Sequence, residues 1–412
     1  MSATTVNAPP AFIRDPRQMR GSNHRGMRQF NERIVLQAIR HAGAIAKADL
    51  ARLTRLSTQT VSIIVDRLLD DGLLLRQPRV RGRIGQPSIP LALNPDGVFS
   101  LGLQVGRRNL EVMVTDFLGQ PRHRLQFRYS SPDPDVVLAH IASGLAQMQQ
   151  TLGNDWERTV GIGLTAPLSM HKWSELFAGP AGDALERWTG VDLVARVQAM
   201  TELPVQFAKD TMAACMAEML QGQGLSIESY LYVFVGTFVG GGLVLGGHIM
   251  AGPHGNAGAI GSMPTAIAQA GGKPAQLLRM ASGQQLERAL EAAGHDPQLA
   301  HDDAIMAPEY ASITDPWLAQ ASLALAMTIV SASALVDLDA TVIDGSLSPA
   351  LIRELIARTR ACVDHYDLEG LDAPSIVAGR VGAHARALGG ALLPLHTQFF
   401  PVKDIFLKQD LE

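Results

Sequence analysis

The first regular pattern in the chain is the period of an α-helix, which runs over residues 31–43 and ends at Gly43. Its apolar positions are Ile34, Val35, Ala38 and Ile39. A second short helix over about residues 47–53 and a tight turn at 54–56 precede a third helix that opens at Ser57. Three short helices with a tight turn before the third are typical of a helix-turn-helix.

The third helix combines a buried stripe with a polar outer face. Its apolar stripe consists of Val61, Ile64, Val65 and Leu68. Ser57 is predicted to cap this helix, because its hydroxyl can accept a hydrogen bond from a free N–H of the first turn. The side chains left to face outward are Thr58, Gln59, Thr60, Ser62 and Arg67. Short hydroxyl and amide groups at the start of a helix suit base edges and phosphates in the major groove of DNA.

A two-stranded wing is predicted after Gly72, with strands near residues 73–77 and 88–93. Its tip is rich in glycine and arginine, and the side chains expected to reach DNA are Arg79, Arg81, Arg83 and Gln86. Arginines on a glycine hinge can follow phosphates or enter a minor groove. The alternative interpretation is a solvated basic hairpin on a helical protein-interaction module.

The distribution of charge favours DNA. Residues 1–95 contain 15 Lys and Arg against 6 Asp and Glu, a balance of +9. The remainder contains 20 against 33, a balance of -13, and the two add up to the formal net charge of -4. A basic N-terminal part on an acidic body indicates that the first part meets a polyanion.

The rest of the chain alternates strand-like and helix-like segments, which predicts an α/β body. Residues 99–116 predict a β-hairpin, and strands are expected near Val160 and near Val205, the second opening into a helix. A further hairpin is predicted around glycines 240–242. The C-terminal part reads as a long buried helix, ASLALAMTIVSASALVDL, then the strand ATVIDGSL and the helix SPALIRELIARTRACV.

The segments STQTVSIIVDRLLDDGLL and RGRIGQPSIPLALNPDG resemble the winged helix-turn-helix of bacterial transcriptional regulators in the ROK family. The order of elements in the body is also similar to the ROK fold, which has two actin-like or hexokinase-like α/β lobes with a cleft between them. The resemblance covers residues 31 to about 396.

The composition of the N-terminus and this resemblance together predict four parts. We expect a disordered basic arm at 1–30, a winged helix-turn-helix domain at 31–95, a two-lobed body at 98–396 that senses an effector and oligomerises, and a tail at 397–412.

The body departs from ROK kinases at the first phosphate motif. Those enzymes carry Asp-x-Gly-x-Thr in the first hairpin, and the matching positions here are Gln104, Gly106 and Arg108. The acidic residue that works through magnesium and the hydroxyl that contacts phosphate are therefore both lost. Gln104 and the arginines can equally be residues of a plain hairpin turn. The run GTFVGGG, from Gly236, resembles the second phosphate-binding segment, whose glycines permit positive φ and allow backbone N–H groups to face an anion.

The sugar-binding positions have changed as well. Asp210 aligns with the catalytic aspartate of the family, and Lys209 stands in place of a sugar-binding asparagine. Asp210 can alternatively serve only as a helix N-cap. In the segment GNAGAIGSMP, Ala259 and Ser262 occupy the positions of the family's glutamate and histidine. We expect the effector to be contacted by Pro167, Lys209, Asp210, Asn256, Gly258 and Ser262.

No metal or cofactor is expected. The family's zinc sites use that histidine and a following cysteine cluster, whereas residues 265–290 contain no cysteine. The two cysteines, Cys215 and Cys362, match no disulfide spacing and suit a reducing cytoplasm. Leu231–Gly247 is uncharged but holds six glycines and strand-like alternation, so no membrane helix is expected.

The sequence therefore predicts a cytoplasmic transcriptional regulator, a repressor of carbohydrate-metabolism genes that senses a sugar or sugar derivative in a kinase-like but non-catalytic body. Its expected partners are a pseudo-palindromic double-stranded DNA operator, the sugar effector and further copies of itself in a homodimer or homotetramer. Two alternatives remain open. One is an active ATP-dependent sugar kinase that carries a DNA-binding domain, and the other is a ligand-free regulator whose body only dimerises.

Overall fold

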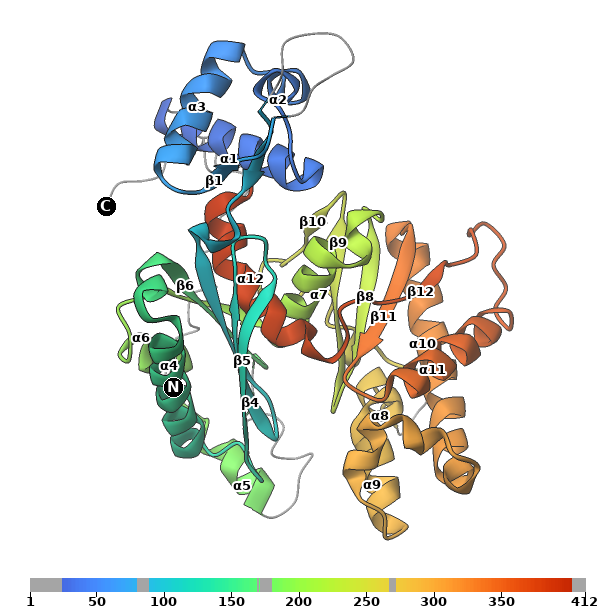
Figure 1. The fold of residues 1–412 in the computed structure, drawn as a ribbon. Helices are drawn as coiled ribbons and strands as arrows, with labels where there is room; N and C mark the ends of the chain where they lie inside the picture. The colour runs from blue at the N-terminus through green and yellow to red at the C-terminus, as the bar shows by residue number, and fades with distance from the viewer. Residues whose placement is uncertain (1–23, 80–88, 169, 171–179, 267–271, 402–412) are drawn as a thin grey trace, which may run out of the picture. The chain divides into compact units, whose positions relative to one another are not determined.

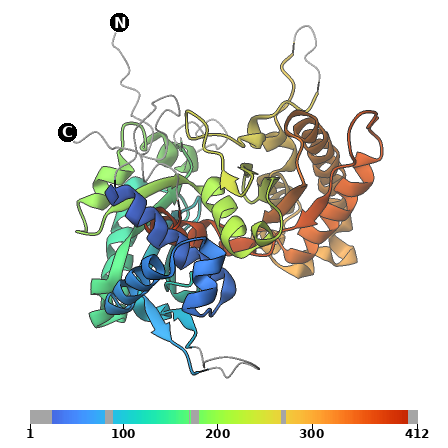
Figure 2. The same ribbon diagram turned by 90° about the horizontal axis from the view of Figure 1, so that it is seen from above.

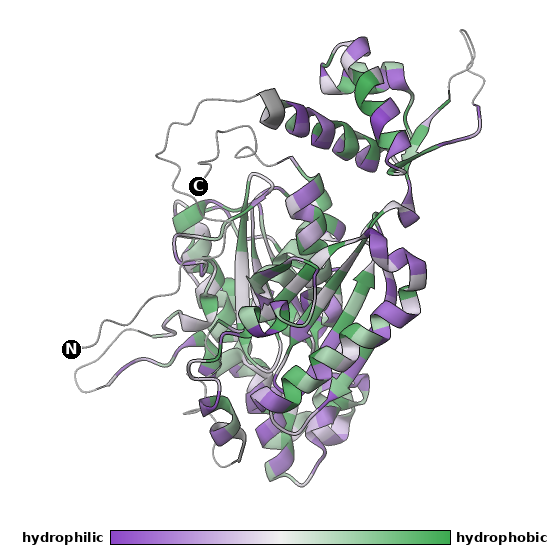
Figure 3. Ribbon diagram, turned by 90° about the vertical axis from the view of Figure 1, so that its left-hand side faces the viewer, coloured by the Kyte–Doolittle hydropathy of each residue, from purple (hydrophilic) through white to green (hydrophobic). Residues whose placement is uncertain are grey.

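The computed structural model describes residues 24–79, 89–168, 170, 180–266 and 272–401. The chain divides into two compact units. Among the described residues, the N-terminal unit comprises 24–164, 170–207 and 390–401, and the C-terminal unit comprises 165–168 and 208–389. Each unit contains one five-stranded sheet, and most strand residues are hydrophobic (Figure 3).

The N-terminal unit begins with a winged helix-turn-helix made of α1 (His24–Ala42), α2 (Lys47–Thr54), α3 (Thr58–Asp70), β1 (Leu74–Arg76) and β2 (Leu91–Leu93). The strands β1 and β2 pair antiparallel. The three helices bury the apolar positions that the sequence predicted, because Val35, Ile39, Val61, Val65 and Leu68 are all fully buried. The predicted three-helix pattern and wing are thus confirmed.

The second part of this unit is an α/β lobe with the strand order β5-β4-β3-β6-β7. Its strands are β3 (Phe99–Val105), β4 (Asn109–Thr115), β5 (Pro121–Arg128), β6 (Thr159–Ala166) and β7 (Val205–Lys209), and its helices are α4 (Pro134–Leu152), α5 (Pro180–Glu186) and α6 (Leu193–Gln198). The helix α4 lies along one face of the sheet (Figure 1). It packs closely there because Gly144 faces Val112 of β4 without a side chain of its own.

The C-terminal unit contains the sheet β10-β9-β8-β11-β12. Its strands are β8 (Tyr230–Val235), β9 (Val239–Leu245), β10 (His248–Ile249), β11 (Ala340–Gly345) and β12 (Ile376–Ala378). Its helices are α7 (Asp210–Gln221), α8 (Leu277–Ala281), α9 (Gly283–Ala292), α10 (Ala311–Val336), α11 (Pro349–Val363) and the beginning of α12 (Ala385–Phe399). All six residues of β8 are buried, so both faces of this sheet are covered.

The two faces of β8 meet different helices. Leu231, Val233 and Val235 belong to the core formed with α10 and α11. Tyr230 and Tyr232 alternate with them and lie near Cys215 and Glu218 of α7. The helix α7 is therefore held against the face opposite to α10.

The predicted hairpin around glycines 240–242 is wrong in its position. The turn lies at residues 236–238, and the three glycines are inside β9, where they pair with β8 in extended conformation and without positive φ. They serve close packing: a Cβ on Gly240 would lie 2.8 Å from Cγ2 of Thr211, and one on Gly242 would lie 2.6 Å from Cβ of Cys215. A glycine run can form a turn or allow another part of the chain to approach closely. In β9 the glycines allow close packing against α7.

The helix α12 begins in the C-terminal unit and ends in the N-terminal unit. It packs closely at Gly389, whose added Cβ would lie 1.7 Å from the carbonyl oxygen of Ala213 in α7. It also packs closely at Gly390, whose carbonyl oxygen would lie 1.9 Å from a Cβ on Gly163 of β6. These two adjacent glycines let the helix pack closely against the backbone of α7 and against that of β6.

Two expected boundaries differ from the structure. The helix α1 begins at His24, so the boundary at residue 30 is wrong for residues 24–30, where the helix continues through Gly26 despite the low helix propensity of glycine. The helix α12 continues to Phe399, so the expected tail at 397 begins too early. Residues 1–23 of the expected arm and 402–412 of the expected tail lie outside the described residues.

One helical stretch among the described residues, Pro308–Val336, is long and apolar enough to cross a membrane by length and composition alone. Core helices meet the same criterion. In this chain Trp317, Leu325 and Ile329 of that stretch are buried in the core of the C-terminal unit.

The contact between Gly163 and α12 can be tested by adding one methyl group. Gly163→Ala places a Cβ against the backbone of Gly390, and we expect the free energy of unfolding to fall by about 1–3 kcal/mol, as for other overpacked cores. Gly272→Ala is the matched control, because its Cβ meets no atom within 4 Å. Chemical denaturation of both variants measures the difference, and equal stability would contradict the close packing.

Candidate functional site

The N-terminal half of α3 presents short polar side chains on its exposed side. Ser57 is the N-cap, as predicted, because its Oγ accepts a hydrogen bond from the N–H of Thr60 at 3.1 Å. Thr58 and Gln59 are exposed, and Thr60 and Ser62 are half-buried. Ile63, which the sequence analysis did not consider, is 65% exposed beside them. An exposed isoleucine among polar residues offers an apolar contact of the kind that a thymine methyl group accepts.

Arg67 does not join this polar group. Its guanidinium lies 3.7 Å from the carboxylate of Glu32 in α1 and 3.8 Å from that of Asp71. Asp66, an exposed acidic residue of α3, is paired with Lys47 at 2.7 Å. The carboxylate nearest to the polar face is therefore already neutralised by a lysine of α2.

The wing is described only at its base. Arg79 is exposed, as is Arg76 of β1, which the sequence analysis did not name. Arg81, Arg83 and Gln86 lie outside the described residues.

Two arginines of α1 attach the helix-turn-helix to the lobe behind it. Arg33 donates from Nη1 to the carbonyl oxygens of Thr397 at 2.9 Å and Phe400 at 3.0 Å, at the C-terminal end of α12. Figures 1 and 2 both show α1 beside this end of α12. Burial lowers the pKa of Arg33 to about 10, against the charge of Glu32, so the side chain remains cationic at neutral pH. A cation at a helix C-terminus donates to the free carbonyl groups there and interacts favourably with the negative end of the helix dipole.

Arg40 makes the second attachment. Its Nη2 donates to the carbonyl oxygen of Phe117 at 2.8 Å, and its guanidinium lies over the rings of Phe117 and Phe400. Burial lowers the pKa of Arg40 to about 10, and the charge of Asp116 opposes this effect. In the sequence pattern both arginines occupy ordinary surface positions of a helix. The sequence therefore gave no signal for these contacts.

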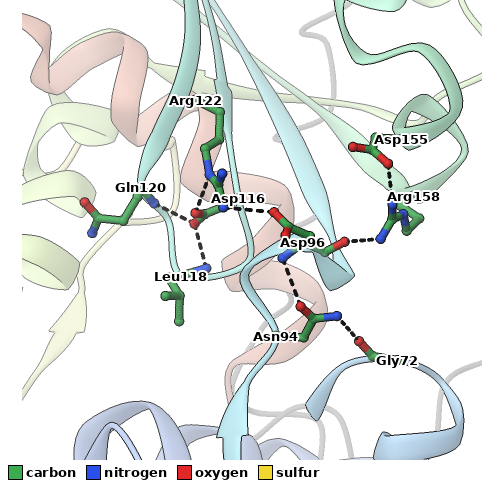
Figure 4. A network of polar contacts seen from close by, with 9 residues as sticks. All are labelled: Gly72, Asn94, Asp96, Asp116, Leu118, Gln120, Arg122, Asp155 and Arg158. Atoms are coloured by element: carbon green, nitrogen blue, oxygen red, sulfur yellow. Dashed lines mark hydrogen bonds and ion pairs between the residues drawn. The ribbon is translucent and has the colours of Figure 1, made fainter. Parts of the chain in front are cut away.

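The linker between the wing and the lobe is held by a polar network (Figure 4). The side chain of Asn94 donates to the carbonyl oxygen of Gly72 at 2.7 Å, at the end of α3, and accepts from the N–H of Asp96 at 3.2 Å. Asn94 therefore ties the linker back to the turn after α3.

Arg122 of β5 joins the linker to the lobe. Its Nη2 contacts Asp96 at 2.9 Å, and its Nε contacts the buried carboxylate of Asp116 at 2.8 Å. Asp116 also accepts from the N–H groups of Leu118 and Gln120 at 2.9 Å each. The hydrogen bond to Asp116 raises the pKa of Arg122.

Arg158 completes this network from the other side of the linker. It donates to the carbonyl oxygen of Asp96 and pairs with Asp155. The linker is thus fixed to the lobe by groups on both sides.

In the C-terminal unit, three of the predicted effector contacts lie together. Lys209 ends β7 and donates from Nζ to Oδ1 of Asn256 at 3.0 Å, while Asp210 begins α7 beside it. Asp210 is the first residue of the helix, and Lys209 is the N-cap, so the alternative of Asp210 as the N-cap is wrong. The Oδ1 atom of Asp210 accepts instead from the N–H of Thr211 at 2.8 Å.

Arg386 is a further member of this group that the sequence did not suggest. Its Nη1 lies 3.7 Å from Oδ2 of Asp210, and its guanidinium stands over the ring of Phe234 at 5.0 Å from the centroid. Arg386 belongs to the first turn of α12, far from Asp210 in the sequence. We name Lys209, Asp210, Asn256 and Arg386 the Asp210 cluster.

The remaining predicted contacts are separate from this cluster in the described contacts. Gly258 has φ +72 and approaches Gly242 so closely that a Cβ would lie 2.6 Å from its Cα, which fixes the loop on β9. Ser262 is exposed, Ala259 is half-buried and Pro167 is half-buried after β6. No described hydrogen bond or ion pair connects Pro167 or Ser262 to Asp210.

The segment that leads into α12 is anchored by two buried carboxylates. Glu218 of α7 accepts from the N–H groups of Arg380 at 3.0 Å and Val381 at 3.1 Å. Asp344 of β11 accepts from the N–H of Gly382 at 2.9 Å. Burial raises the pKa of Asp344, and hydrogen bonds from the N–H groups of Gly382 and Gly345 oppose the rise. The start of α12 is therefore firmly attached to α7 and β11.

The first hairpin of the lobe carries the positions of the phosphate motif. Gln104 is buried inside β3, with its Nε2 lacking a hydrogen-bond partner, whereas Arg107 and Arg108 lie in the turn. The hydroxyl of Tyr129 donates into this turn, to the carbonyl oxygens of Gly106 and Asn109. No group of three His, Cys, Asp or Glu side chains within the described ranges is arranged to hold a metal ion.

Comparison with known proteins agrees with both parts of this architecture. The ROK family profile matches residues 100–397, and a MarR family profile matches residues 29–83. The uncharacterized protein y4fQ of Sinorhizobium fredii is 25% identical over 90% of this chain and 92% of its own length. The xylose repressor of Bacillus subtilis is 24% identical over 58% of this chain, which spans 61% of the repressor.

A solved ROK family transcriptional regulator, described as a homologue of the E. coli MLC protein, shares the fold. It has a TM-score of 0.67 and 22% identity, and the alignment covers 91% of this chain and 97% of that structure. The ROK profile alone accounts for well over half of the chain. The chain therefore belongs to the ROK family, as a DNA-binding transcriptional regulator with an N-terminal winged helix-turn-helix.

Proposed function

We propose that this protein is a repressor of carbohydrate-metabolism genes that binds operator DNA through α3 and the wing and binds a sugar or sugar derivative at the Asp210 cluster. The observation that carries this proposal is the position of α12. Its first turn holds Arg386, the ion-pair partner of Asp210, and the carbonyl groups at its last turn hold Arg33 of α1. One helix thus connects the effector contacts with the DNA-binding domain.

The DNA contacts follow from the exposed side of α3. Thr58, Gln59 and Ser62 would read base edges, and Ser57 and Thr60 would lie near phosphates at the helix N-terminus. Arg79 at the base of the wing would contact the phosphate backbone of the DNA together with Arg81 and Arg83. Gln86 and Arg67 would make a smaller contribution to DNA binding. The basic balance of residues 1–95 supports this assignment.

The effector would be contacted by Asp210, Lys209 and Asn256, with Gly258 shaping the loop and Pro167 and Ser262 at the periphery. A sugar hydroxyl that donates to Asp210 competes with Arg386 for the same carboxylate. At 3.7 Å this ion pair is longer than a charge-assisted hydrogen bond of about 2.7–2.9 Å, so replacing it with a hydrogen bond to a sugar hydroxyl costs less than breaking a short ion pair. Any displacement of Arg386 would move the first turn of α12, to which this residue belongs.

The mechanism is a population shift between DNA-binding and released states. A ligand shifts this equilibrium only by the difference in its affinity for the two states. We assign that difference to the position of α12, which sets the position of α1 through Arg33 and Arg40. The network around Asp96 would keep the linker rigid, so that a movement of α12 reaches α3 and is not lost in a flexible joint.

We further infer a homodimer or homotetramer in the cytoplasm and a pseudo-palindromic operator, with half-sites about 34 Å apart if two recognition helices occupy successive major-groove turns. Catalysis is not part of this function. Gln104 and Arg108 occupy positions where the resemblance calls for a magnesium-linked aspartate and a phosphate-binding hydroxyl, and the kinase alternative rests on Asp210 and the run GTFVGGG.

The DNA-binding face can be tested at Ser57 by separating its two roles. Ser57→Ala removes the N-cap hydrogen bond and is expected to lower the free energy of unfolding by about 1 kcal/mol. Ser57→Asp keeps a capping oxygen but places a negative charge towards phosphates, so stability is retained and operator affinity falls. Denaturation and operator binding measure the two effects. Full operator affinity in Ser57→Asp would exclude this face from the DNA interface.

The effector function is tested by a thermal-shift screen of carbohydrates on the full-length protein, followed by operator binding with each hit. We expect at least one carbohydrate to raise the melting temperature and to weaken operator binding, and Asp210→Asn to reduce both effects. A panel in which no carbohydrate changes operator binding would contradict the proposal. Turnover with magnesium-ATP and a sugar that Asp210→Asn abolishes would instead establish the kinase alternative.

A further inference from the structure

The Asp210 cluster carries more positive than negative charge. Lys209 and Arg386 are both half-buried or nearly buried cations, and Asp210 is the only carboxylate that the described contacts bring to them. The side chains of Arg386 and Asp210 are only 20% and 12% exposed. Two cations and one anion, shielded from water at the Arg386–Asp210 end and open to it at the Lys209–Asn256 end, are incompletely neutralised.

The cluster also has more hydrogen-bond donors than acceptors. Oδ1 of Asp210 already accepts the N–H of Thr211, and the described ion pair of Arg386 is with Oδ2. The Nε atom of Arg386 is buried and has no hydrogen-bond partner. The Nζ atom of Lys209 has one described acceptor, Asn256, although an ammonium group can donate three hydrogen bonds.

The donors are held in place before any ligand binds. The guanidinium of Arg386 is fixed over the ring of Phe234, and Lys209 is held by Asn256. Burial lowers the pKa of Lys209, and the charge of Asp210 opposes this effect only in part. A fixed, planar guanidinium suits bidentate contact with a carboxylate or a phosphate, and charged acceptors relieve the cost of a shielded cation.

We propose that the effector is an acidic carbohydrate, whose carboxylate or phosphate group accepts from Arg386 and Lys209 while its hydroxyls contact Asp210 and Asn256. This inference rests on the proposed effector function and names the ligand class for the same site. A neutral sugar offers only hydroxyl acceptors, which form weaker hydrogen bonds with a cation than charged acceptors do. Carboxylate and phosphate share the required chemistry, and the experiment separates them.

The test compares neutral sugars with their acidic derivatives on the full-length protein by isothermal titration calorimetry. The ligands are a set of pentoses and hexoses, each with its uronate, its aldonate and its phosphate ester, with acetate and inorganic phosphate as bare anions. We expect one acidic carbohydrate to bind at least about ten-fold more tightly than its neutral parent and to weaken operator binding. Whether that ligand is a carboxylate or a phosphate identifies the acidic group.

Two variants assign the effect to the cluster. Lys209→Asn removes one cation and keeps a polar side chain, and we expect it to weaken the acidic ligand about ten-fold and the neutral parent by a smaller factor, because only the acidic ligand loses a charge-assisted hydrogen bond. Lys273→Asn, which removes an exposed lysine of the same unit, is the matched control and should change neither.

The outcomes that overturn the inference differ from those that overturn the proposed function. A neutral sugar that binds as tightly as its acidic derivatives and releases operator DNA overturns the acidic class alone. Inorganic phosphate that binds as tightly as a sugar phosphate overturns carbohydrate recognition at this anion site. If no carbohydrate changes operator binding, the inference and the proposed function both fail.

Discussion

Pro394 lacks an amide hydrogen, so it cannot donate to the carbonyl oxygen of Gly390 one helical turn earlier in α12. That carbonyl faces Gly163 of β6 at a distance that excludes a side chain. The adjacent Gly389 faces the backbone of α7 in the same way. Two adjacent glycines thus let α12 pack closely on a backbone in each unit, Gly389 on α7 in the C-terminal unit and Gly390 on β6 in the N-terminal unit.

The ends of α12 carry the groups that matter for function. In its first turn, Arg386 meets Asp210 and Phe234, and the preceding segment is anchored by Glu218 and Asp344. At its last turn, free carbonyl groups accept from Arg33. A helix can transmit a displacement over its length because its internal hydrogen bonds keep it stiff, and attachment at both ends is what coupling between two sites requires.

Local sequence patterns predicted the DNA-binding domain well, because its determinants are close in sequence. Val61, Ile64, Val65 and Leu68 lie on one face of a single helix, and Ser57 caps that helix three residues before Thr60. The glycines at 240–242 were misplaced, because a glycine run has the same appearance in a turn and in a strand that another backbone approaches. The extension of α1 to His24 was missed because Gly26 and polar neighbours gave no apolar period.

The candidate site was predicted only in part. Lys209, Asp210 and Asn256 were named from the sequence, but their grouping with Arg386 depends on how α12 returns to α7. Periodicity contains no information about such a contact. The same holds for Arg33 and Arg40, whose partners are backbone carbonyl oxygens, since these oxygens are present at every residue and give no signal in a sequence.

The central claim is that α12 couples the Asp210 cluster to the DNA-binding domain, and operator affinity with and without saturating effector tests it most directly. In the full-length protein the account predicts a coupling of about 5–150-fold, retained in Arg28→Gln, which changes an exposed arginine of α1. In Arg33→Gln, which removes the contact with α12, operator binding should persist while the response to effector largely disappears. An undiminished effector response in Arg33→Gln would contradict the account.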